Sequence, residues 1–229
     1  MVLNITKLGE DVLRQKATPV TEINDDIRKL AEDMFDTMIA ANGVGLACPQ
    51  VGLSIRMFVI IADDDVRRVF INPQIIKTSE ETCDYEEGCL SLPQVWEVIN
   101  RPEKVTVQAL DQNGKPFTLE ADGFLARIIQ HENDHLDGIL YIDRGDPDFA
   151  AKTTEQFKKR AERAAEKAKA KEEEIQKQER LAKEAKRLQE QLEADSKDPN
   201  RVKIREAENT LNQIATISKE INFGECDEK

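Results

Sequence analysis

Histidine, cysteine and aromatic residues are scarce in this chain. Its 229 residues include two histidines, four cysteines and one tryptophan, and aromatic residues make up 5% of the total. Four scattered cysteines are too few for a disulfide-stabilised secreted domain, so we expect reduced thiols, one of them free to bind a metal. No apolar run has the length of a membrane span, and none follows a basic start at the N-terminus. We therefore expect a soluble, cytoplasmic protein with no membrane contact.

Positive charge is scarce in the first two thirds of the chain. Residues 1–150 contain 14 Lys and Arg against 27 Asp and Glu, whereas residues 151–229 contain 19 against 18. An acidic surface is a poor partner for nucleic acid, so we expect no DNA binding by the first part. The second part lacks the apolar density for a core of its own. The composition thus predicts a folded domain over 1–150 and a charged helical extension over 151–229.

Apolar spacing predicts the elements of the first part. Spacings of three and four indicate a helix over 25–41, and β-rich runs indicate strands over 55–61, 69–76, 104–110 and 117–121. The stretch 111–115 is typical of a hairpin turn. A helix over 123–136 follows, with Asp122 as its N-cap and Gly138 near its end. This order predicts an α+β fold, in which the second helix is central and packs against antiparallel sheets. The predicted inner face of the first helix is Ile27, Leu30, Ala31, Met34, Phe35, Met38 and Ile39.

The two histidines lie on this central helix, in the stretch IIQHENDHLDG. His131 and His135 are four residues apart, so both imidazoles project from one side and can reach one ion. Glu132 lies roughly 100° around the helix from His131, close enough to reach a metal-bound water without ligating the metal. A chance grouping on a surface helix is the alternative, but the apolar neighbours argue against it.

A catalytic metal site usually has three protein ligands and one open position. No histidine remains, so the third ligand must be Cys, Asp or Glu, and Cys89 in EEGCLSLP is the strongest candidate. Gly88 and Pro93 bend the chain on either side of it. Taken alone, Cys89 is better interpreted as a small buried apolar residue. Beside two histidines that lack a third ligand, its interpretation as a metal ligand is favoured.

Three ordered motifs resemble those of bacterial peptide deformylases. They are GVGLACPQ at 43–50, EGCLSLP at 87–93 and QHENDHLDG at 130–138, and the resemblance covers residues 1 to roughly 147. The resemblance implies that Cys89, His131 and His135 hold one divalent metal. In this family the usual physiological metal is ferrous iron, while zinc, nickel or cobalt can occupy the site.

The resemblance also implies an activity, which is removal of the formyl group from the formyl-methionine of nascent peptides, with release of formate. A metal-bound water would be the nucleophile, Glu132 the general acid and base, and Gln50 with the backbone N–H of Leu90 the oxyanion donors. It further implies that Glu87 and Arg101 form an ion pair that steadies the cysteine loop, for which a solvated surface contact is the alternative. The substrate-binding residues that it implies are Gly43, Val44, Gly45, Leu46, Glu87, Gly88, Leu125 and Ile128.

One residue departs from the family pattern. Cys48 stands where the family usually has alanine. We expect it either to pack as a small apolar residue or to make the site more sensitive to oxidation.

The extension lies outside the resemblance. From Thr154 to about Asp195 it is rich in strong helix formers, with an interrupted apolar seam, and residues 195–200 break the helix. A second amphipathic segment could fold back as a hairpin, with a solvated extension as the alternative. Residues 158–171 have a net charge of +5, which could attract phosphate-rich RNA. The resemblance implies that a C-terminal helix docks on the ribosome, so we expect this helix to tether the enzyme near the exit tunnel. The predicted seam is Phe157, Ala161, Ala164, Ala168, Ile175, Ala182, Ala185 and Leu192, and the second segment has Leu211, Ile214, Ile217 and Ile221 on one side.

Two other functions compete with formyl-peptide hydrolysis. A metallopeptidase shares the histidine pair and the glutamate, but commonly takes a third His or Glu as ligand instead of a cysteine. A helical adaptor carrying an inactive domain would need no intact site, yet none of the implied catalytic positions is lost. Formyl-peptide hydrolysis is therefore the leading hypothesis.

Overall fold

The computed structural model describes the backbone of residues 1–195 and 204–223 and the side chains of residues 1–193 and 206–216. The chain divides into two compact units, Met1–Ala161 and Glu162–Lys229. The domain boundary after residue 150 stays a prediction. The elements, in chain order, are the 3-10 helix η1 (Asp11–Arg14), α1 (Asp25–Ala40), β1 (Gly45–Ala47), η2 (Cys48–Val51), β2 (Met57–Ile61), β3 (Arg67–Thr78), β4 (Thr82–Cys89), β5 (Leu92–Pro102), β6 (Lys104–Leu110), β7 (Pro116–Asp122), α2 (Gly123–Leu136), η3 (Tyr141–Arg144), α3 (Pro147–Asp195) and α4 (Ile204–Phe223).

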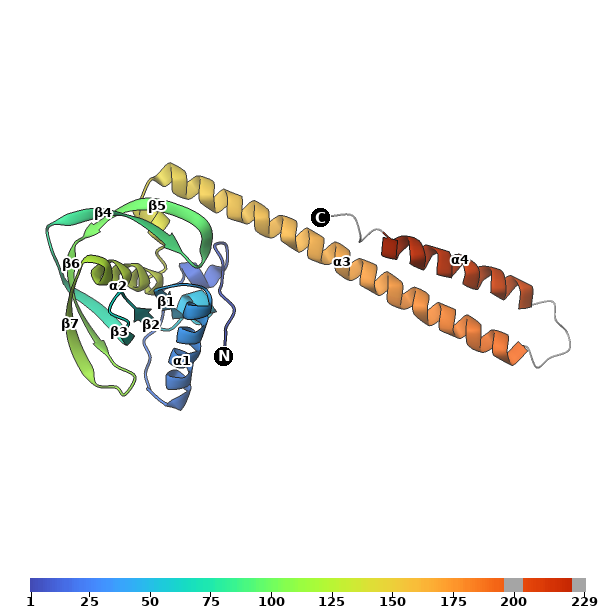
Figure 1. Cartoon of the computed structure of the whole chain (residues 1–229), viewed down its shortest axis with the longest axis horizontal. Coiled ribbons are helices and arrows are strands. Elements are labelled where there is room, and N and C mark those ends of the chain that lie inside the picture. The colour runs from blue at the N-terminus through green and yellow to red at the C-terminus, as the bar shows by residue number, and fades with distance from the viewer. Residues whose placement is uncertain (196–203, 224–229) are drawn as a thin grey trace. The chain divides into compact units, whose positions relative to one another are not determined.

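Two antiparallel sheets build the first unit, as the sequence predicted. Five strands form one sheet in the order β1-β2-β3-β6-β7, and β4 pairs with β5 in a second sheet of two strands. Figure 1 shows α2 enclosed by these strands, with α1 on the outside next to β1 and β2. The α+β architecture with a central helix is confirmed.

The predicted hairpin turn joins β6 and β7. The Asp111 carboxylate accepts hydrogen bonds from the backbone N–H groups of Asn113 and Lys115, at 2.8 and 2.9 Å. Gly114 has φ +77°, a conformation that glycine adopts without steric cost. This turn fixes the register of the pair, in which Val107 lies opposite Leu119.

Helix α1 begins after its N-cap residue, Asn24. The Asn24 side chain accepts a hydrogen bond from the backbone N–H of Ile27, which satisfies one of the free donors of the first turn. Of the predicted inner face, Ala31, Met34, Phe35 and Met38 are buried. Ile39 is 56% exposed, so its place on that face was predicted wrongly. It lies in the last turn, where the helix leaves the core.

Three strands were not predicted from the sequence: β1, β4 and β5. The strand β4, TCDYEEGC, has few apolar residues, and the sheet that it forms with β5 buries charged groups beside the apolar Leu92 and Ile99 of β5. Glu87 and Arg101 are both buried there. An apolar pattern does not reveal strands whose inward residues are paired charges.

Helix α2 is the centre of the first unit. It spans Gly123–Leu136, as predicted, and the left-handed Gly138 (φ +73°) follows its end. Asp122 occupies the N-cap position, but its side chain makes no capping hydrogen bond. Most of the helix is buried, including Arg127, Gln130 and Asp134 as well as its apolar residues.

The first turns of α3 belong to the core of the first unit. Phe157 is buried in a cluster with Leu8, Leu13, Tyr141 and other apolar residues, while Phe149 and Ala150 pack against that cluster. Helix α3 therefore begins at Pro147, earlier than the predicted start at Thr154. Packing against the domain, and not helix propensity alone, determines where it starts.

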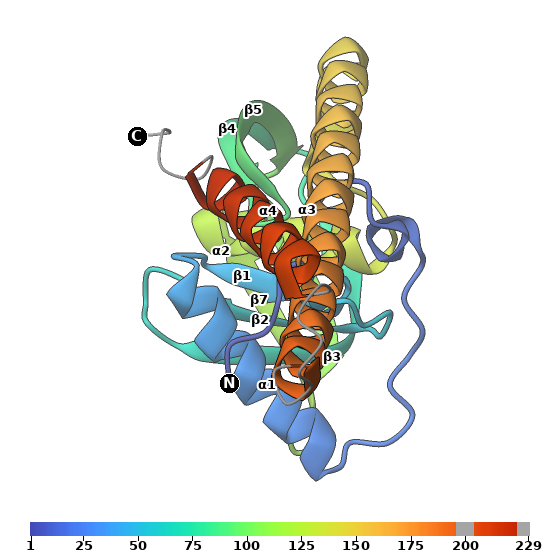
Figure 2. The same cartoon turned by 90° about the vertical axis from the view of Figure 1, so that its right-hand side faces the viewer.

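In the second unit, α4 lies alongside the distal part of α3 (Figures 1 and 2). The partly buried apolar residues are Leu181, Ala185, Leu188 and Leu192 in α3 and Ala207, Leu211 and Ile214 in α4. Of the predicted seam, Phe157 is buried in the first unit and Ala185 and Leu192 are partly buried, whereas the prediction is wrong for Ala161, Ala164, Ala168, Ile175 and Ala182, which are exposed. Side chains 217–221 lie outside the described residues. No helix among the described residues is long and apolar enough to cross a membrane.

Candidate metal centre

Three side chains converge at the centre of the first unit. His131 and His135 lie one turn apart on α2, with ring centroids 5.2 Å apart, and both are buried. Cys89 ends β4, and its Sγ lies 3.3 Å from Nε2 of His135. One ligand atom from each of the three residues lies within 4.8 Å of the others. The structure therefore brings together residues that are 42 positions or more apart in the chain, Cys89 and the histidine pair.

The donor set fits a divalent transition metal. One thiolate and two imidazoles are the ligand types that such ions prefer, and three protein ligands leave a coordination position free. The Nδ1 atom of His131 is 2.8 Å from Oε2 of Glu87, so Nε2 remains for a metal. A carboxylate on the second ring nitrogen is the usual device that orients a metal-binding imidazole.

Electrostatics favour the protonation state that a metal needs at His135. Burial lowers the pKa of His135 well below its usual value, and the positive charges of His131 and Arg101 lower it further. Burial also lowers the pKa of His131, but hydrogen bonds with Cys89 and Glu87 outweigh burial and raise it. The lowered pKa of His135 favours its neutral imidazole, which is the form that binds a metal.

Glu132 is buried beside the two histidines. Burial raises the pKa of its carboxyl group to about 7, with Glu87 adding to the shift and the charges of His131 and Arg101 opposing it. Its Oε2 has no hydrogen-bond partner within the described part of the chain. A Cβ atom on Gly45 would lie 2.8 Å from Cδ of Glu132, so the carboxylate occupies space that only a glycine leaves free. A buried carboxyl group that titrates near neutrality suits proton transfer.

Gln50 and Leu90 flank the same centre. The side-chain oxygen of Gln50 accepts a hydrogen bond from the backbone N–H of Ala47 at 2.8 Å. That bond turns Nε2 toward Sγ of Cys89 and Oγ of Ser91, each at 3.4 Å. The backbone carbonyl of Leu90 accepts a hydrogen bond from Lys7 Nζ at 2.8 Å. The amide of Gln50 is therefore fixed with its donor side facing the candidate ligands.

A cavity of about 600 Å³ opens onto these residues. Gln50, Cys89, His131 and Glu132 line it, and so do Leu90 and five of the predicted substrate-binding residues, which are Val44, Gly45, Glu87, Gly88 and Ile128. The other three, Gly43, Leu46 and Leu125, do not border it. Leu46 is fully buried in the core that faces α1, because alternate residues of β1 point to opposite faces.

A buried ion network surrounds the site. Arg101 donates to both carboxylate oxygens of Glu87, at 2.7 and 3.1 Å, and Arg127 donates to Oε1 at 3.0 Å. Burial raises the pKa of Glu87, but its hydrogen bonds with His131 and Arg101 outweigh burial and lower the pKa to about 2. The Glu87–Arg101 pair is thus buried, with both side chains 4% exposed, and not a solvated surface contact.

Sequence reasoning missed Arg127, Asp134 and Trp96. Arg127 and Asp134 join the ion network from α2, and Trp96 lines the cavity. Charged residues at 127 and 134 on a helix that was predicted to be central were the available signal, because buried charges need partners. For Trp96 the sequence held no such signal, since its strand was not predicted.

Cys48 is fully buried in the core that faces α1, and burial raises the pKa of its thiol. Its Sγ contacts Sδ of Met34 at 3.5 Å. A protonated, enclosed thiol reacts slowly with oxidants. Of the two expectations for Cys48, packing as a small apolar residue is the one that this environment supports.

Comparisons with known proteins agree on one family. The model of the family described as polypeptide deformylase matches residues 2–150. The chain is 53% identical over 139 residues to a peptide deformylase of Treponema pallidum, covering 61% of this chain and 85% of the relative. It is 45% identical over 171 residues to a peptide deformylase of Fusobacterium nucleatum, and this match covers 72% of this chain and 98% of the relative. A crystal structure of a peptide deformylase from Synechococcus elongatus, in complex with actinonin, has a TM-score of 0.64 at 42% identity, covering 67% of this chain and 85% of that one.

Proposed function

The chain belongs to the polypeptide deformylase family, and on that premise we propose that it hydrolyses the N-formyl group of formyl-methionine on nascent peptides and releases formate. The observation that carries this proposal is the convergence of Cys89, His131 and His135 beside Glu132 at one cavity. We place the reaction in the cytoplasm, where peptides are synthesised.

Cys89, His131 and His135 are the ligands of one divalent metal in this proposal. Ferrous iron is the physiological metal that we propose, with zinc, nickel or cobalt able to replace it. When bound, such an ion acidifies a water molecule and polarises a carbonyl group. Metal analysis of protein purified without oxygen tests the identity, and iron near one equivalent per chain is the expected result.

Glu132 is the general acid and base. Its carboxylate takes a proton from the attacking water and delivers it to the departing amine, for which a pKa near 7 is well placed. Gln50 Nε2 and the backbone N–H of Leu90 stabilise the negative charge that grows on the carbonyl oxygen. Gln50 is held for this by its bond with the Ala47 N–H. These donors need no rearrangement when the charge develops.

The peptide lies along β1 in this proposal. That strand pairs with β2 on one side, and among the described strands it has no neighbour on the other, so its free backbone groups can pair with an extended peptide. The methionine side chain enters the cavity next to Val44 and Ile128. Apolar walls with few polar groups are typical of a pocket for such a side chain.

Incubation with formyl-Met-Ala-Ser and with the unformylated peptide tests the activity. Release of formate from the first peptide, with both peptide backbones intact, is the expected result. Cleavage inside either peptide would instead show a metallopeptidase. A protein that binds metal but yields neither product would support the helical adaptor.

We also propose that α3 docks the enzyme on ribosomal RNA near the exit tunnel. All side chains from Lys158 to Glu173 are exposed, so the basic stretch 158–171 is free to meet phosphate groups. Docking there would raise the local concentration of enzyme near emerging peptides. Because Phe157 packs in the core of the first unit, substitution in the full chain is a better test than truncation at residue 150.

The docking test uses two matched sets of substitutions in α3. The triple substitution of Lys167, Lys169 and Lys171 by Gln should weaken co-sedimentation with ribosomes, so that the variant dissociates at a lower salt concentration than the unsubstituted protein. Lys177, Lys183 and Lys186→Gln remove the same charge from exposed positions outside the basic stretch and should change it less. Equal co-sedimentation of both sets at every salt concentration would end the proposal.

A further inference from the structure

The 3-10 helix η3, Tyr141–Arg144, is linked to the candidate metal ligand His131 in two independent ways, one direct and one indirect. It joins α2 to α3, and no residue of η3 lines the cavity. Tyr141 reaches the imidazole directly, whereas Arg144 reaches it through a series of ion pairs. We propose that Tyr141 and Arg144 are positioning residues for His131. This inference rests on the metal site of the proposed function.

Tyr141 holds one face of the imidazole. Its ring stacks on that of His131, with centroids 5.7 Å apart and planes 23° apart. The Tyr141 hydroxyl donates a hydrogen bond to the backbone carbonyl of Val95, at 2.9 Å, so β5 fixes the tyrosine ring in turn. Tyr141 is buried, and the bond to Val95 satisfies its only donor. The ring plane of His131 therefore depends on a side chain that never touches the substrate.

Arg144 acts on the second ring nitrogen of His131 from a distance. It donates to both carboxylate oxygens of Asp134, at 2.6 and 3.2 Å, in a bidentate pair. Asp134 also accepts from Arg101 at 2.6 Å, and Arg101 holds Glu87, whose Oε2 is 2.8 Å from Nδ1 of His131. Positive and negative groups alternate along this series, so each buried charge has an opposite neighbour.

Removal of one charged group from this series changes how strongly its neighbour binds the following group. Without Arg144, Asp134 keeps Arg101 as its cation and draws on it more strongly. Arg101 is then held less firmly by Glu87, which keeps Arg127 on Oε1 at 3.0 Å, so the hydrogen bond at His131 Nδ1 changes its geometry but is not lost. Groups that orient a ligand in this way typically change metal affinity about 10- to 100-fold.

Titration of the full-length protein with Co²⁺ tests the proposal, since the visible absorption of bound cobalt reports the ligand geometry. Tyr141→Leu should raise the dissociation constant about 10- to 100-fold and shift the absorption bands. Tyr141→Phe keeps the stacked ring but loses the bond to Val95, so its change should be smaller than that of Tyr141→Leu. Arg144→Gln should give a smaller change of the same kind, and Arg144→Lys, which cannot form the bidentate pair, should restore only part of it.

Two control variants separate positioning from general loss of stability. Phe35→Leu shortens an equally buried aromatic residue in a different core cluster. Arg67→Gln removes an arginine that is 47% exposed and paired with Glu32, as Arg144 is 46% exposed and paired with Asp134. Both controls should lower thermal stability without shifting the cobalt absorption.

The outcomes distinguish the inference from the proposed function. If the unsubstituted protein binds no Co²⁺, the metal site itself is wrong. If it binds Co²⁺, and Tyr141→Leu and Arg144→Gln match their controls in both dissociation constant and absorption, the positioning role is overturned. With formyl-Met-Ala-Ser as substrate, a positioning role further requires kcat to fall while KM stays the same, because neither residue borders the cavity.

Discussion

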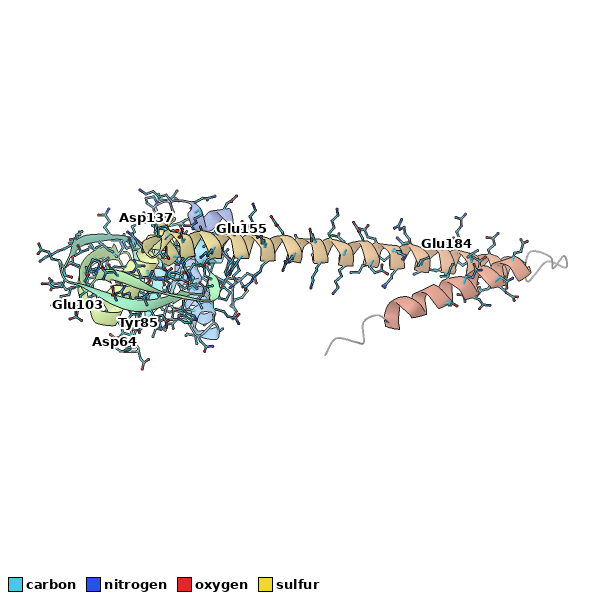
Figure 3. The ribbon with its side chains drawn as sticks, turned by 90° about the horizontal axis from the view of Figure 1, so that it is seen from above. Asp64, Tyr85, Glu103, Asp137, Glu155 and Glu184 are labelled. Carbon is cyan, nitrogen blue, oxygen red and sulfur yellow. The ribbon has the colours of Figure 1, made fainter. Side chains whose placement is uncertain are left out.

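The two units of this protein use the same charged residue types in opposite ways. Around the candidate metal centre, Glu87, Arg101, Arg127 and Asp134 are buried and joined into one network. In the second unit almost all of the described charges stand in solvent, Glu174 being partly buried. Figure 3 shows this for Glu184, and the side chains of the Lys186–Glu190 pair are 80% and 67% exposed. Buried charges require partners and fixed geometry, whereas exposed ones mainly keep a helix hydrated. The expected effects of substitution therefore differ between the units.

The largest expected effect is at Glu132. Glu132→Gln removes the proposed general acid and base but keeps its size, so kcat/KM on formyl-Met-Ala-Ser should fall about 10²- to 10⁴-fold. Metal content should stay the same, because Glu132 is not among the three candidate ligands. A variant that loses metal together with activity would contradict this division of roles.

Next is Arg101, the centre of the buried network. Arg101→Ala leaves Glu87 and Asp134 without one of their cations in a buried environment, which should cost about 3–5 kcal/mol of unfolding free energy. Urea unfolding followed by circular dichroism measures it. A loss below about 1 kcal/mol, as for an exposed pair, would erase the contrast between the units.

Gln50→Ala removes one of the two proposed oxyanion donors and should lower kcat about 100- to 1,000-fold. The loss should appear mainly in kcat, because the donor acts on charge that develops in the transition state. Steady-state kinetics at saturating formyl-peptide separates the two constants. An unchanged kcat with a raised KM would show that Gln50 binds substrate instead.

Gly45→Ala tests the close approach of β1 to Glu132. The added Cβ would collide with the carboxyl group and with Ile128, and displacing Glu132 by about 1 Å should lower kcat about a hundredfold. Gly43→Ala is the matched control. Its Cβ would meet the end of the flexible Leu90 side chain, which can move, so the loss should be smaller. Equal losses of kcat in both variants would show that displacement of Glu132 is not the cause of the loss.

The smallest effect is expected in the extension. Lys186→Ala breaks an exposed pair 4.0 Å long and should change the stability of its helix by less than about 0.5 kcal/mol. Thermal loss of helicity, followed by far-ultraviolet circular dichroism in the full chain, measures this. A change comparable to that of Arg101→Ala would mean that the extension holds its charges as tightly as the catalytic unit does.

The sequence predicted those parts of the fold whose pattern is local. The spacing of apolar residues located α1, α2 and four strands, and the DQNGK stretch located the turn between β6 and β7. It failed where a strand buries paired charges, in β4 and β5, and where packing decides a boundary, at the start of α3. The seam of the extension was misplaced because apolar residues at helical spacing are buried only where a second helix covers them.

For the site, residue identity and order were enough to select candidates. Two histidines four apart with an adjacent glutamate predict a metal-binding face from helix geometry, and one cysteine motif supplied the third candidate. Arg127 and Asp134 gave only the signal of charges on a central helix, and Tyr141 and Arg144 gave none, because their contacts are with residues that are distant in the chain. Only the folded chain brings η3, β4 and α2 together around His131. The sequence by itself determines local periodicity and side-chain chemistry. Long-range contacts depend on how the elements pack, and this packing decides which charges are buried and paired.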